Sequence, residues 1–452
     1  MPYSPVPFES GRFRYMEPAV PSARAMSPFW CIGGTCLASV GRHPEVDMPN
    51  TRDHSRDTLA LILAGGNGTR LGSLTRWQCK PAIPFAGHFR NIDFTLSNCL
   101  NSNLRRVGVL TQYKAQTLIG HIHQGWDVVS RRAGEFVDVW PAQQRLHSSW
   151  YSGTADAVHQ NLDLVLAQRT KYILVLAGDH IYKMDYRTLI DQHVTNKADV
   201  TVGAIPVPVE EASAFGVLGI DSRGRVRTFI EKPAPSALRT TQATVTASMG
   251  IYVFDTDFLV DRLTRDARNT ASAHDFGRDI LPAAVRESRV NAYLFADGEG
   301  RPEYWRDVGT IDSYWQAHME LVSPEPPIDL YDTSWPISTA SEPLPPARLV
   351  NDKMHTGFVA NSLLSGGVIV RGATVTESVL SPNVTVDADS IIDQAVLLPG
   401  ARIGARCEIR RAIVDANVVV PPGTVIGSAA GGISLVTRES LERVESAASS
   451  AA

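Results

Sequence analysis

Short runs of apolar residues alternate along the chain with segments whose apolar residues recur at helical spacing. The first run ends abruptly in Gly65-Gly66, and residues 154–165 are the clearest helical segment between two runs. Runs that are short and apolar throughout are typical of strands buried on both faces of a parallel sheet. Alternating strands and helices therefore predict an α/β domain with a doubly wound, mostly parallel sheet, which binds ligands at the carboxyl ends of its strands. The runs cover residues 58–63, 106–111, 172–176 and 199–205.

A second pattern begins after a proline-rich stretch. Residues 323–346 contain seven prolines, which indicates a linker rather than a packed element. Beyond it, apolar residues recur every six positions with glycines between them, a period that fits neither an amphipathic helix nor a long strand. It is typical of the hexapeptide repeat of a left-handed parallel β-helix, whose coils stack aliphatic residues on one another. An irregular β-domain is the alternative, because residues 379–396 break the period. The repeating positions are Leu363, Ile369, Val375, Leu397, Ile403, Ile409, Val414, Val420 and Ile426.

These patterns divide the chain into five segments. Residues 1–56 hold scattered prolines and no sustained period, so we expect a disordered or loosely attached extension. Met48 precedes the first strand closely, and a start codon there would leave part of this extension outside the native protein. The remaining expected segments are the α/β domain (57–321), the linker (322–349), the β-helix (350–438) and a low-complexity tail (439–452).

Composition narrows the class of protein. Apolar residues make up 44% of the chain and charged residues 20%, which excludes general disorder. The net charge of -4 gives no electrostatic reason to expect nucleic acid or a membrane surface as a partner, and no apolar run is long enough to span a bilayer. The five cysteines are odd in number and lack CxxC pairs, so they indicate neither a disulfide framework nor a zinc site. We expect a reduced, cytoplasmic protein.

The strongest local signal is Leu63-Ala-Gly-Gly-Asn-Gly-Thr-Arg-Leu71, directly after the first strand. Glycines at this place let backbone N–H groups close around a phosphate, and Arg70 adds a fixed positive charge. The segment is not a Walker A loop, because no Gly-Lys-Ser/Thr follows. It is a poor dinucleotide fingerprint, because Leu71 stands where the third glycine would be. On glycine density alone, a tight strand-to-helix turn is an equal alternative.

Several further motifs make the chain recognisable. Gly65-Gly-Asn-Gly-Thr-Arg-Leu71 followed by Lys80-Pro81 resembles the signature of sugar-nucleotide pyrophosphorylases. Together with the β-helix, the motifs resemble the bacterial ADP-glucose pyrophosphorylases (glucose-1-phosphate adenylyltransferases) from about residue 59 to residue 438. The resemblance implies a Rossmann-like nucleotidyltransferase domain at residues 57–321. The motifs are Pro141-Ala-Gln-Gln-Arg145, Trp150-Tyr-Ser-Gly-Thr-Ala-Asp-Ala157, Ala177-Gly-Asp-His-Ile-Tyr-Lys183, Phe229-Ile-Glu-Lys-Pro233, Ser248-Met-Gly-Ile-Tyr-Val-Phe254, His274-Asp-Phe-Gly277 and Tyr304-Trp-Arg-Asp-Val-Gly-Thr310.

The reaction that this resemblance implies brings two polyanions together. The phosphate of α-D-glucose 1-phosphate attacks the α-phosphorus of ATP, ADP-glucose forms for glycogen biosynthesis, and pyrophosphate leaves. The negative charge must be neutralised, and Mg²⁺, which prefers carboxylate oxygens, is the implied cofactor. Asp179 ends an apolar strand and Asp307 follows Trp305-Arg306, so the resemblance makes these two carboxylates the metal ligands. The implied catalytic residues are Arg70, Lys80 and Asp179.

By the same resemblance, two groups of residues, which share Tyr151, bind the two substrates. For the pair Glu231-Lys232, the alternative is an exposed couple of charges. The implied nucleotide-binding residues are Gly65, Gly66, Gly68, Thr69, Gln143, Tyr151 and Gly153. The implied glucose-1-phosphate-binding residues are Tyr151, Gly178, Glu231, Lys232, Ser248, Tyr252, Asp275, Phe276 and Trp305.

The chain departs from the resembled family where many bacterial members bind a phosphorylated activator. Their segment Gly-Gly-Lys-Phe-Arg is Ala86-Gly-His-Phe-Arg90 here, and their basic Arg-Arg-Phe loop near the C-terminus has no counterpart. The candidate effector residues that remain are His88, Arg90, Arg410 and Arg411. We therefore expect weak or absent activation by fructose 1,6-bisphosphate, the alternative being that His88 is merely a surface residue. The family also implies a homotetramer.

Three other functions stay open at this stage. The first is a related enzyme that uses UTP, dTTP or GTP, which the motifs around Gln143 and Tyr151 disfavour. The second is a non-catalytic regulatory subunit, which is disfavoured because Arg70, Lys80 and Asp179 are all present. The third is a bifunctional acyltransferase, although the short β-helix lacks an obvious histidine-based acyl-transfer site.

Overall fold

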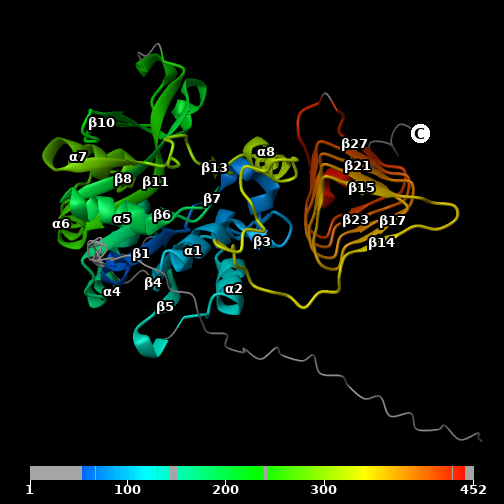
Figure 1. Ribbon diagram of the computed structural model, residues 1–452, viewed down its shortest axis with the longest axis horizontal. Helices are drawn as coiled ribbons and strands as arrows, with labels where there is room; N and C mark the ends of the chain where they lie inside the picture. The colour runs from blue at the N-terminus through cyan, green and yellow to red at the C-terminus, as the bar shows by residue number, and fades with distance from the viewer. Residues whose placement is uncertain are drawn as a thin grey trace, which may run out of the picture. The chain divides into compact units, whose positions relative to one another are not determined.

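A computed structural model of the chain describes residues 53–66, 68–129, 131–142, 150–238, 242–429 and 431–442. A nine-stranded sheet forms the centre of the α/β domain (Figure 1). Its strands β5, β4, β1 and β6 are parallel neighbours, whereas β11 runs antiparallel to β6, β8 and β9. The predicted α/β fold is confirmed, with an antiparallel part that the apolar runs did not indicate. The strands are β1 (Thr58–Leu63), β4 (Arg106–Thr111), β5 (Phe136–Pro141), β6 (Tyr172–Ala177), β8 (Val200–Pro208), β9 (Gly216–Ile220), β10 (Val226–Glu231), β11 (Thr244–Asp255) and β12 (Val290–Leu294).

Helices pack on both faces of this sheet. Successive side chains of a strand point to opposite faces, so Leu59 and Leu61 of β1 enter one buried cluster while Ala60 and Ile62 enter the other. The cluster of Ala60 is closed by α1 (Asn91–Asn101), α2 (Gln116–Gly125) and α5 (Tyr186–Thr195). The cluster of Leu59 is closed by α3 (Thr154–His159), α4 (Leu162–Ala167), α6 (Thr256–Asp266) and α7 (Leu281–Glu287).

The helical segment expected at residues 154–165 is divided into α3 and α4. Asn161 interrupts it: its side-chain amide donates to the Ala157 carbonyl at 2.8 Å and to the Tyr151 hydroxyl at 2.9 Å. Its backbone (φ -112°, ψ 18°) lies outside the helical region. A side chain that bonds locally to the backbone competes with the helical hydrogen bonds, and so the helix ends there.

Several small elements complete the α/β domain. Among the described helices, none combines the length and apolar character that a membrane span requires. Of the small elements, the pair β7 and β13 matters most for function, because its register sets His180 opposite Asp307. These elements are η1 (His54–Asp57), η2 (Thr69–Thr75), η3 (Lys80–Ala82), β2 (Pro84–Phe85), β3 (Phe89–Arg90), η4 (Arg131–Ala133), β7 (His180–Tyr182), η5 (Val209–Ala214), η6 (Pro235–Ala237), the π-helical turn η7 (Phe276–Ile280), β13 (Trp305–Asp307) and α8 (Ile311–Leu321).

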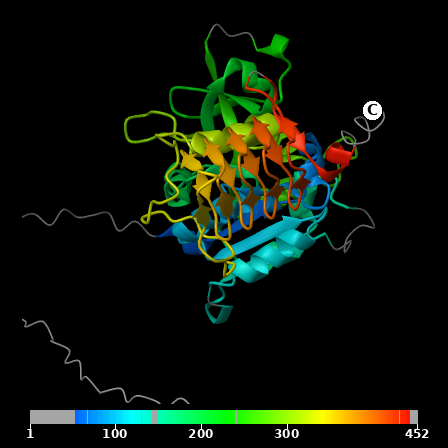
Figure 2. The ribbon, with the colours of Figure 1, turned by 90° about the vertical axis from the view of Figure 1, so that its right-hand side faces the viewer.

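The C-terminal part is a stack of coils with three parallel sheets (Figure 2). The repeating residues from Val375 to Val420 fill its interior, which decides against an irregular β-domain, but in the first coil the inward residues are Leu364 and Val370 rather than the predicted Leu363 and Ile369. The period is not broken at residues 379–396, because Leu380, Val386 and Ile392 continue the interior stack and this coil is as long as the next, with Val379 paired to Val396 and Val396 to Ile413. The sheets comprise β14 (Arg348–Val350), β17 (Ile369–Arg371), β20 (Thr385–Val386), β23 (Arg402–Ile403) and β26 (Val419–Val420); β15 (Phe358–Ala360), β18 (Thr374–Thr376), β21 (Ile391–Asp393), β24 (Glu408–Arg410) and β27 (Val425–Ile426); and β16 (Leu363–Leu364), β19 (Val379–Leu380), β22 (Val396–Leu397), β25 (Ala412–Val414) and β28 (Ser434–Val436).

The proline-rich stretch at residues 323–346 has no helix or strand, and β14 begins at Arg348, just inside the expected linker. The stretch is nevertheless hydrogen-bonded to α1. Trp335 donates its indole N–H to Asn98 at 2.9 Å, and the Thr339 hydroxyl donates to Asp93 at 2.6 Å. Before the linker, Trp315 of α8 donates its indole N–H to the Gln394 carbonyl of the β-helix at 2.8 Å. The sequence pattern predicted an unpacked linker, but polar side chains on α1 hold it in place.

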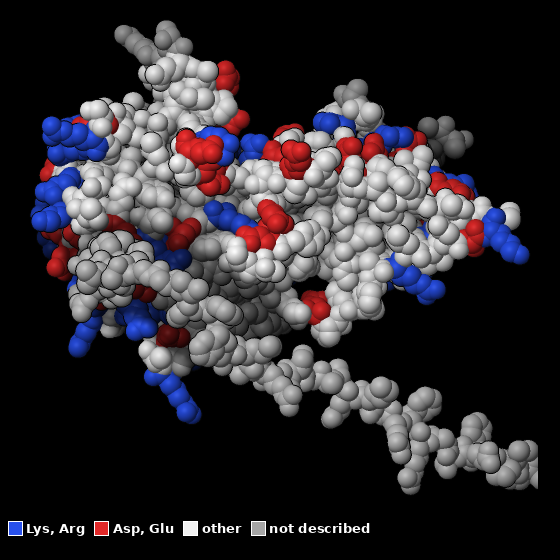
Figure 3. Space-filling model, in the orientation of Figure 1, with Lys and Arg blue, Asp and Glu red and all other residues white. Residues whose placement is uncertain are grey.

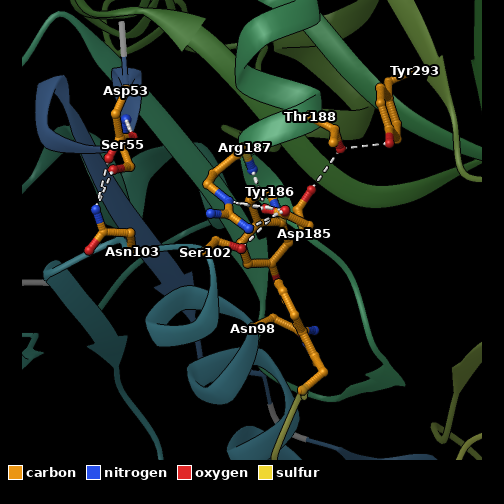
Figure 4. A network of polar contacts seen from close by, with 11 residues as sticks. Asp53, Ser55, Asn98, Ser102, Asn103, Asp185, Tyr186, Arg187, Thr188 and Tyr293 are labelled. Atoms are coloured by element: carbon orange, nitrogen blue, oxygen red, sulfur yellow. Dashed lines mark hydrogen bonds and ion pairs between the residues drawn. The ribbon is translucent and has the colours of Figure 1, made fainter. Parts of the chain in front are cut away.

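A polar network ties the start of the described chain to α1 and α5 (Figure 4). Asn103, just after α1, donates to Asp53 at 2.8 Å, and Ser102 accepts from the Tyr186 N–H at 2.8 Å. Asp185 caps α5 by accepting from the Arg187 N–H at 2.9 Å. On the face drawn in Figure 3, basic and acidic side chains are intermixed, without a broad basic area there.

Candidate active site

The glycine-rich segment leaves the carboxyl end of β1, where the parallel strands β4 and β6 also end. Gly68 has φ +60°, and a Cβ there would lie 2.8 Å from the Thr75 Cγ2, so both its conformation and its packing require glycine. Gly66 is exposed, with no atom within 4 Å of the position that a Cβ would take, and Thr69 is exposed as well. The loop thus offers an open backbone surface at the ligand edge of the sheet.

Lys80 connects two carboxylates from distant parts of the chain. Its Nζ lies 2.7 Å from Asp179 Oδ2 and 2.6 Å from Asp307 Oδ1. Burial on its own would lower the pKa of Lys80, but the two carboxylates outweigh it and raise that pKa. Burial likewise opposes the charge of Asp179, yet the lysine holds the pKa of Asp179 below its usual value. Lys80 and Asp179 are therefore both charged at neutral pH.

Gly309 lets Arg70 join this cluster. A Cβ at Gly309 would lie 2.9 Å from Asp307 Oδ1, 3.0 Å from Lys80 Nζ and 3.2 Å from Arg70 Nη2. Arg70, Lys80 and Asp307 thus converge on one glycine, beside a cavity of about 1110 Å³ that Arg70 and Asp307 line. Sequence reasoning missed Gly309, although it lies inside the quoted motif at residues 304–310.

The carboxylates of this cluster suit a Mg²⁺ ion that is also bound by substrate phosphates, rather than an ion bound by protein side chains alone. In the described part of the chain, no three His, Cys, Asp or Glu side chains are placed to hold a metal by themselves. Mg²⁺ is commonly bound by one or two carboxylates together with substrate phosphates. Asp179 and Asp307, bridged by one lysine, match that arrangement.

Glu231 and Lys232 lie at the end of β10, on the sugar side of the expected site. Glycines make room for the carboxylate: a Cβ at Gly277 would lie 2.4 Å from Glu231 Oε2, and one at Gly216 would lie 2.9 Å from it. Burial raises the pKa of Glu231. Lys232 has φ +44° and a side chain more than half exposed, with its Nζ 3.5 Å from Glu231 Oε1. The ammonium is therefore accessible to a phosphate.

Ser248 and Tyr252 lie together on β11, and the Ser248 hydroxyl donates to the Tyr252 hydroxyl at 3.2 Å. Phe276 is buried and packs against Tyr252, with ring centroids 6.0 Å apart. Asp275 is different, because both of its oxygens accept hydrogen bonds from the protein. Oδ1 caps η7 and Oδ2 accepts from Thr154 at 2.9 Å. Both carboxylate oxygens of Asp275 are therefore engaged within the protein.

Trp305 and His180 form the wall next to the carboxylates, with ring centroids 4.9 Å apart and edge to face. Within the described residues, Trp305 Nε1 and His180 Nδ1 are buried without a hydrogen-bond partner. Buried polar atoms of this kind are normally satisfied, so a ligand or water is the expected partner. Gly178 has another role: its N–H donates to the Leu63 carbonyl at 3.2 Å, and a Cβ there would crowd Ile62.

The segment expected to cover the nucleotide is described only from Trp150 onward, so Gln143 lies outside the described residues. Gln112, at the end of β4, accepts from the Tyr151 N–H at 2.6 Å. Gln112 was missed from the sequence, although its place after an apolar strand was a usable signal. Gly153 is pressed against the next loop, since its Cβ would lie 2.3 Å from the His274 carbonyl oxygen.

The four candidate effector residues are not brought together. His88 and Arg90 line a cavity of about 870 Å³ with Arg402, which sequence reasoning missed. Arg410 instead pairs with Glu408 at 2.7 Å, and Arg411 lies over the Trp315 ring at 4.6 Å. Burial lowers the pKa of His88, so this side chain is neutral at pH 7.5.

Comparisons with known proteins agree with this geometry. A nucleotidyl transferase family model matches residues 59–323, and a model of the GlmU-like C-terminal hexapeptide matches residues 345–431. The chain is 51% identical to the glucose-1-phosphate adenylyltransferase of Methylococcus capsulatus over 82% of its length and 89% of the relative. It is 52% identical to that of Methylobacillus flagellatus over the same shares, and 49% identical to glucose-1-phosphate adenylyltransferase 2 of Pseudoalteromonas atlantica over 86% and 96%. The chain therefore belongs to the glucose-1-phosphate adenylyltransferase family.

Proposed function

We propose that this chain transfers the adenylyl group of ATP to α-D-glucose 1-phosphate, giving ADP-glucose and pyrophosphate. The observation that carries the proposal is Lys80 Nζ within 2.7 Å of both Asp179 and Asp307, with Arg70 beside it. A triphosphate bound on the glycine loop meets two cations there. The same loop is the one that follows β1 at the ligand edge of the sheet.

Each residue then has a defined task. Arg70 and Lys80 bind the triphosphate and stabilise the charge of the departing pyrophosphate. Asp179 and Asp307 would hold Mg²⁺, which, when bound, neutralises part of the phosphate charge. Lys232 binds the sugar phosphate and orients it for in-line attack on the α-phosphorus, since holding both reactants in place supplies much of the rate.

The sugar is held on the other side of the same edge. Glu231 has oxygens that accept hydrogen bonds from glucose hydroxyls, while Ser248 and Tyr252 offer hydroxyls that donate and accept. Phe276 and Trp305 supply apolar walls that exclude water from the reacting phosphates. Tyr151, held by Gln112, covers the nucleotide side.

The test is release of pyrophosphate from glucose 1-phosphate with ATP, UTP, dTTP and GTP in parallel. We expect a clear preference for ATP. Turnover with UTP equal to or above that with ATP would overturn the nucleotide assignment. Absence of turnover with all four would favour a regulatory subunit, and acetyl transfer from acetyl-CoA to a sugar would favour the acyltransferase.

Regulation, assembly and location are further parts of the proposal. The cavity of His88, Arg90 and Arg402 has the charge to take an anionic effector. However, Arg90 already donates to His121 Nδ1 at 3.2 Å and to the Ala82 carbonyl. We propose that the enzyme depends on Mg²⁺, forms a homotetramer, and acts in glycogen biosynthesis in the cytoplasm. Light scattering tests the oligomeric state, and activity after chelation of Mg²⁺ tests the metal dependence.

A further inference from the structure

His274 begins the motif at residues 274–277, and the roles assigned so far leave it without one. Its backbone lies in the left-handed region, with φ +54°. This conformation is uncommon for a residue other than glycine, because the Cβ crowds the backbone there, and it persists where the surroundings hold it. The contacts that enforce it therefore indicate what His274 does.

A ring of three hydrogen bonds holds the His274 backbone. Its Nδ1 donates to Asp266 Oδ2 at 2.8 Å, the Ser272 hydroxyl donates to Asp266 Oδ1 at 2.7 Å, and the His274 N–H donates to the Ser272 hydroxyl at 2.9 Å. The His274 and Asp266 side chains are only 21% and 11% exposed. Both carboxylate oxygens of Asp266 are thus used to fix one turn of the loop after α6.

On one side, this turn is hydrogen-bonded to the start of α3, next to the segment expected to cover the nucleotide. The His274 carbonyl accepts from the N–H groups of Ala155 at 2.8 Å and Asp156 at 3.2 Å, which lie in the first turn of α3. Gly153 fits against the same oxygen, since its Cβ would lie 2.3 Å from it. The His274 carbonyl thus anchors the start of α3 a few residues after Tyr151, which Gln112 and Asn161 also hold.

On the other side, the same turn leads directly into the sugar side of the site. Thr154 donates to Asp275 at 2.9 Å and accepts from the Phe276 N–H at 3.0 Å. Phe276 packs against Tyr252, and Gly277 adjoins the Glu231 carboxylate. A shift of the His274 backbone would move both halves of the site together.

We propose that His274 is a positioning residue for adenylyl transfer. Through its hydrogen bond to Asp266, it aligns residues 151–156 on the nucleotide side with residues 275–277 on the sugar side. The proposal rests on the proposed function. It accounts for a partly buried imidazole on a left-handed backbone to which no substrate-binding role is assigned. It also predicts a kinetic signature that a merely structural residue would lack.

Two variants and a matched control test the proposal. His274→Gly relaxes the backbone but removes the Nδ1 donor. His274→Asn keeps a side-chain donor and tolerates the left-handed region. Lys197→Gly is the control, because Lys197 has φ +48° in the same domain, is exposed and lies outside the site. We expect His274→Gly to lower kcat/KM for ATP and for glucose 1-phosphate in parallel by about tenfold or more. His274→Asn and Lys197→Gly should stay near the parent.

Amide hydrogen exchange provides a readout that does not depend on the reaction. Exchange at Ala155 and Asp156 should accelerate in His274→Gly and stay at the parent rate in the other two variants. An inactive parent would overturn the proposed function, while this measurement would still test the positioning. A kinetic loss for one substrate only, unchanged kinetics in His274→Gly, or an equal loss in His274→Asn would overturn the role of His274. All measurements are made below the unfolding temperature of each variant.

Discussion

His318 of α8 accepts a hydrogen bond at its Nε2 from the backbone N–H of Ala86, at 3.1 Å. Its Nδ1 must then carry the proton, which it donates to the Tyr314 carbonyl at 2.8 Å. Both nitrogens of this buried ring are used by the neutral form. Burial accordingly lowers the pKa of His318 to about 4.

This lowered pKa makes stability depend on pH. The unfolded chain, with a histidine pKa near 6.5, takes up the proton first, so stability falls as the pH falls from about 6.5 towards 4. The loss from pH 7 to pH 5 is about 2 kcal/mol for this group. Urea unfolding at the two pH values measures it. In His318→Gln the difference between the two values should shrink, and an unchanged difference would contradict the assignment.

Asp179→Asn tests the metal ligand. The change keeps the shape but removes one charge from the cluster around Lys80, and electrostatic stabilisation of this kind is worth roughly 3 kcal/mol or more. We expect kcat to fall by at least about 100-fold at saturating Mg²⁺, with the fold intact by circular dichroism. Near-normal turnover would show that Asp179 is not a ligand.

Lys232→Ala tests the binding of the sugar phosphate. The exposed ammonium contacts the substrate already in the ground state, so its loss should mainly raise KM for glucose 1-phosphate and leave KM for ATP nearly unchanged. Steady-state kinetics with each substrate varied in turn give the answer. An unchanged KM for glucose 1-phosphate would remove Lys232 from the site.

Gly309→Ala tests the convergence of Arg70, Lys80 and Asp307. The new methyl group would lie within 3.2 Å of all three and separate them, so kcat should fall by about tenfold or more because the groups lose their alignment. Gly298→Ala is the matched control, since no atom lies within 4 Å of its Cβ position. Equal activity of the two variants would argue against a tight cluster.

Activation by fructose 1,6-bisphosphate should be weak or absent. His88 is neutral at pH 7.5 and supplies no charge where many relatives of the resembled family carry a lysine, and Arg410 and Arg411 lie elsewhere. ADP-glucose synthesis at sub-saturating ATP, with and without millimolar effector, measures this. Strong activation at micromolar concentration would show that Arg90 and Arg402 suffice.

The sequence alone determined the two repeating patterns and the motifs that follow the strands. A strand buried on both faces must be apolar throughout, and stacked coils must repeat their inward residues. Both folds therefore leave a pattern that is visible in the sequence. Chain connectivity then places Asp179 at the end of β6 and the glycine loop at the end of β1, because parallel strands share one ligand edge. These conclusions need no knowledge of distant contacts.

Only the tertiary structure decided which distant residues meet. Lys80 and Asp307 lie in a common cluster through the pairing of β7 with β13, a long-range register that no local pattern encodes. Asp275 and Glu231 are equally acidic in the sequence, yet one caps a helical turn while the other lies in a space left by two glycines. The linker, too, looked unpacked, because its buried residue Ile328 belongs to no apolar period and its hydrogen bonds to α1 come from residues distant in the sequence. The role of a polar residue depends on its partners, and partners are set by the fold.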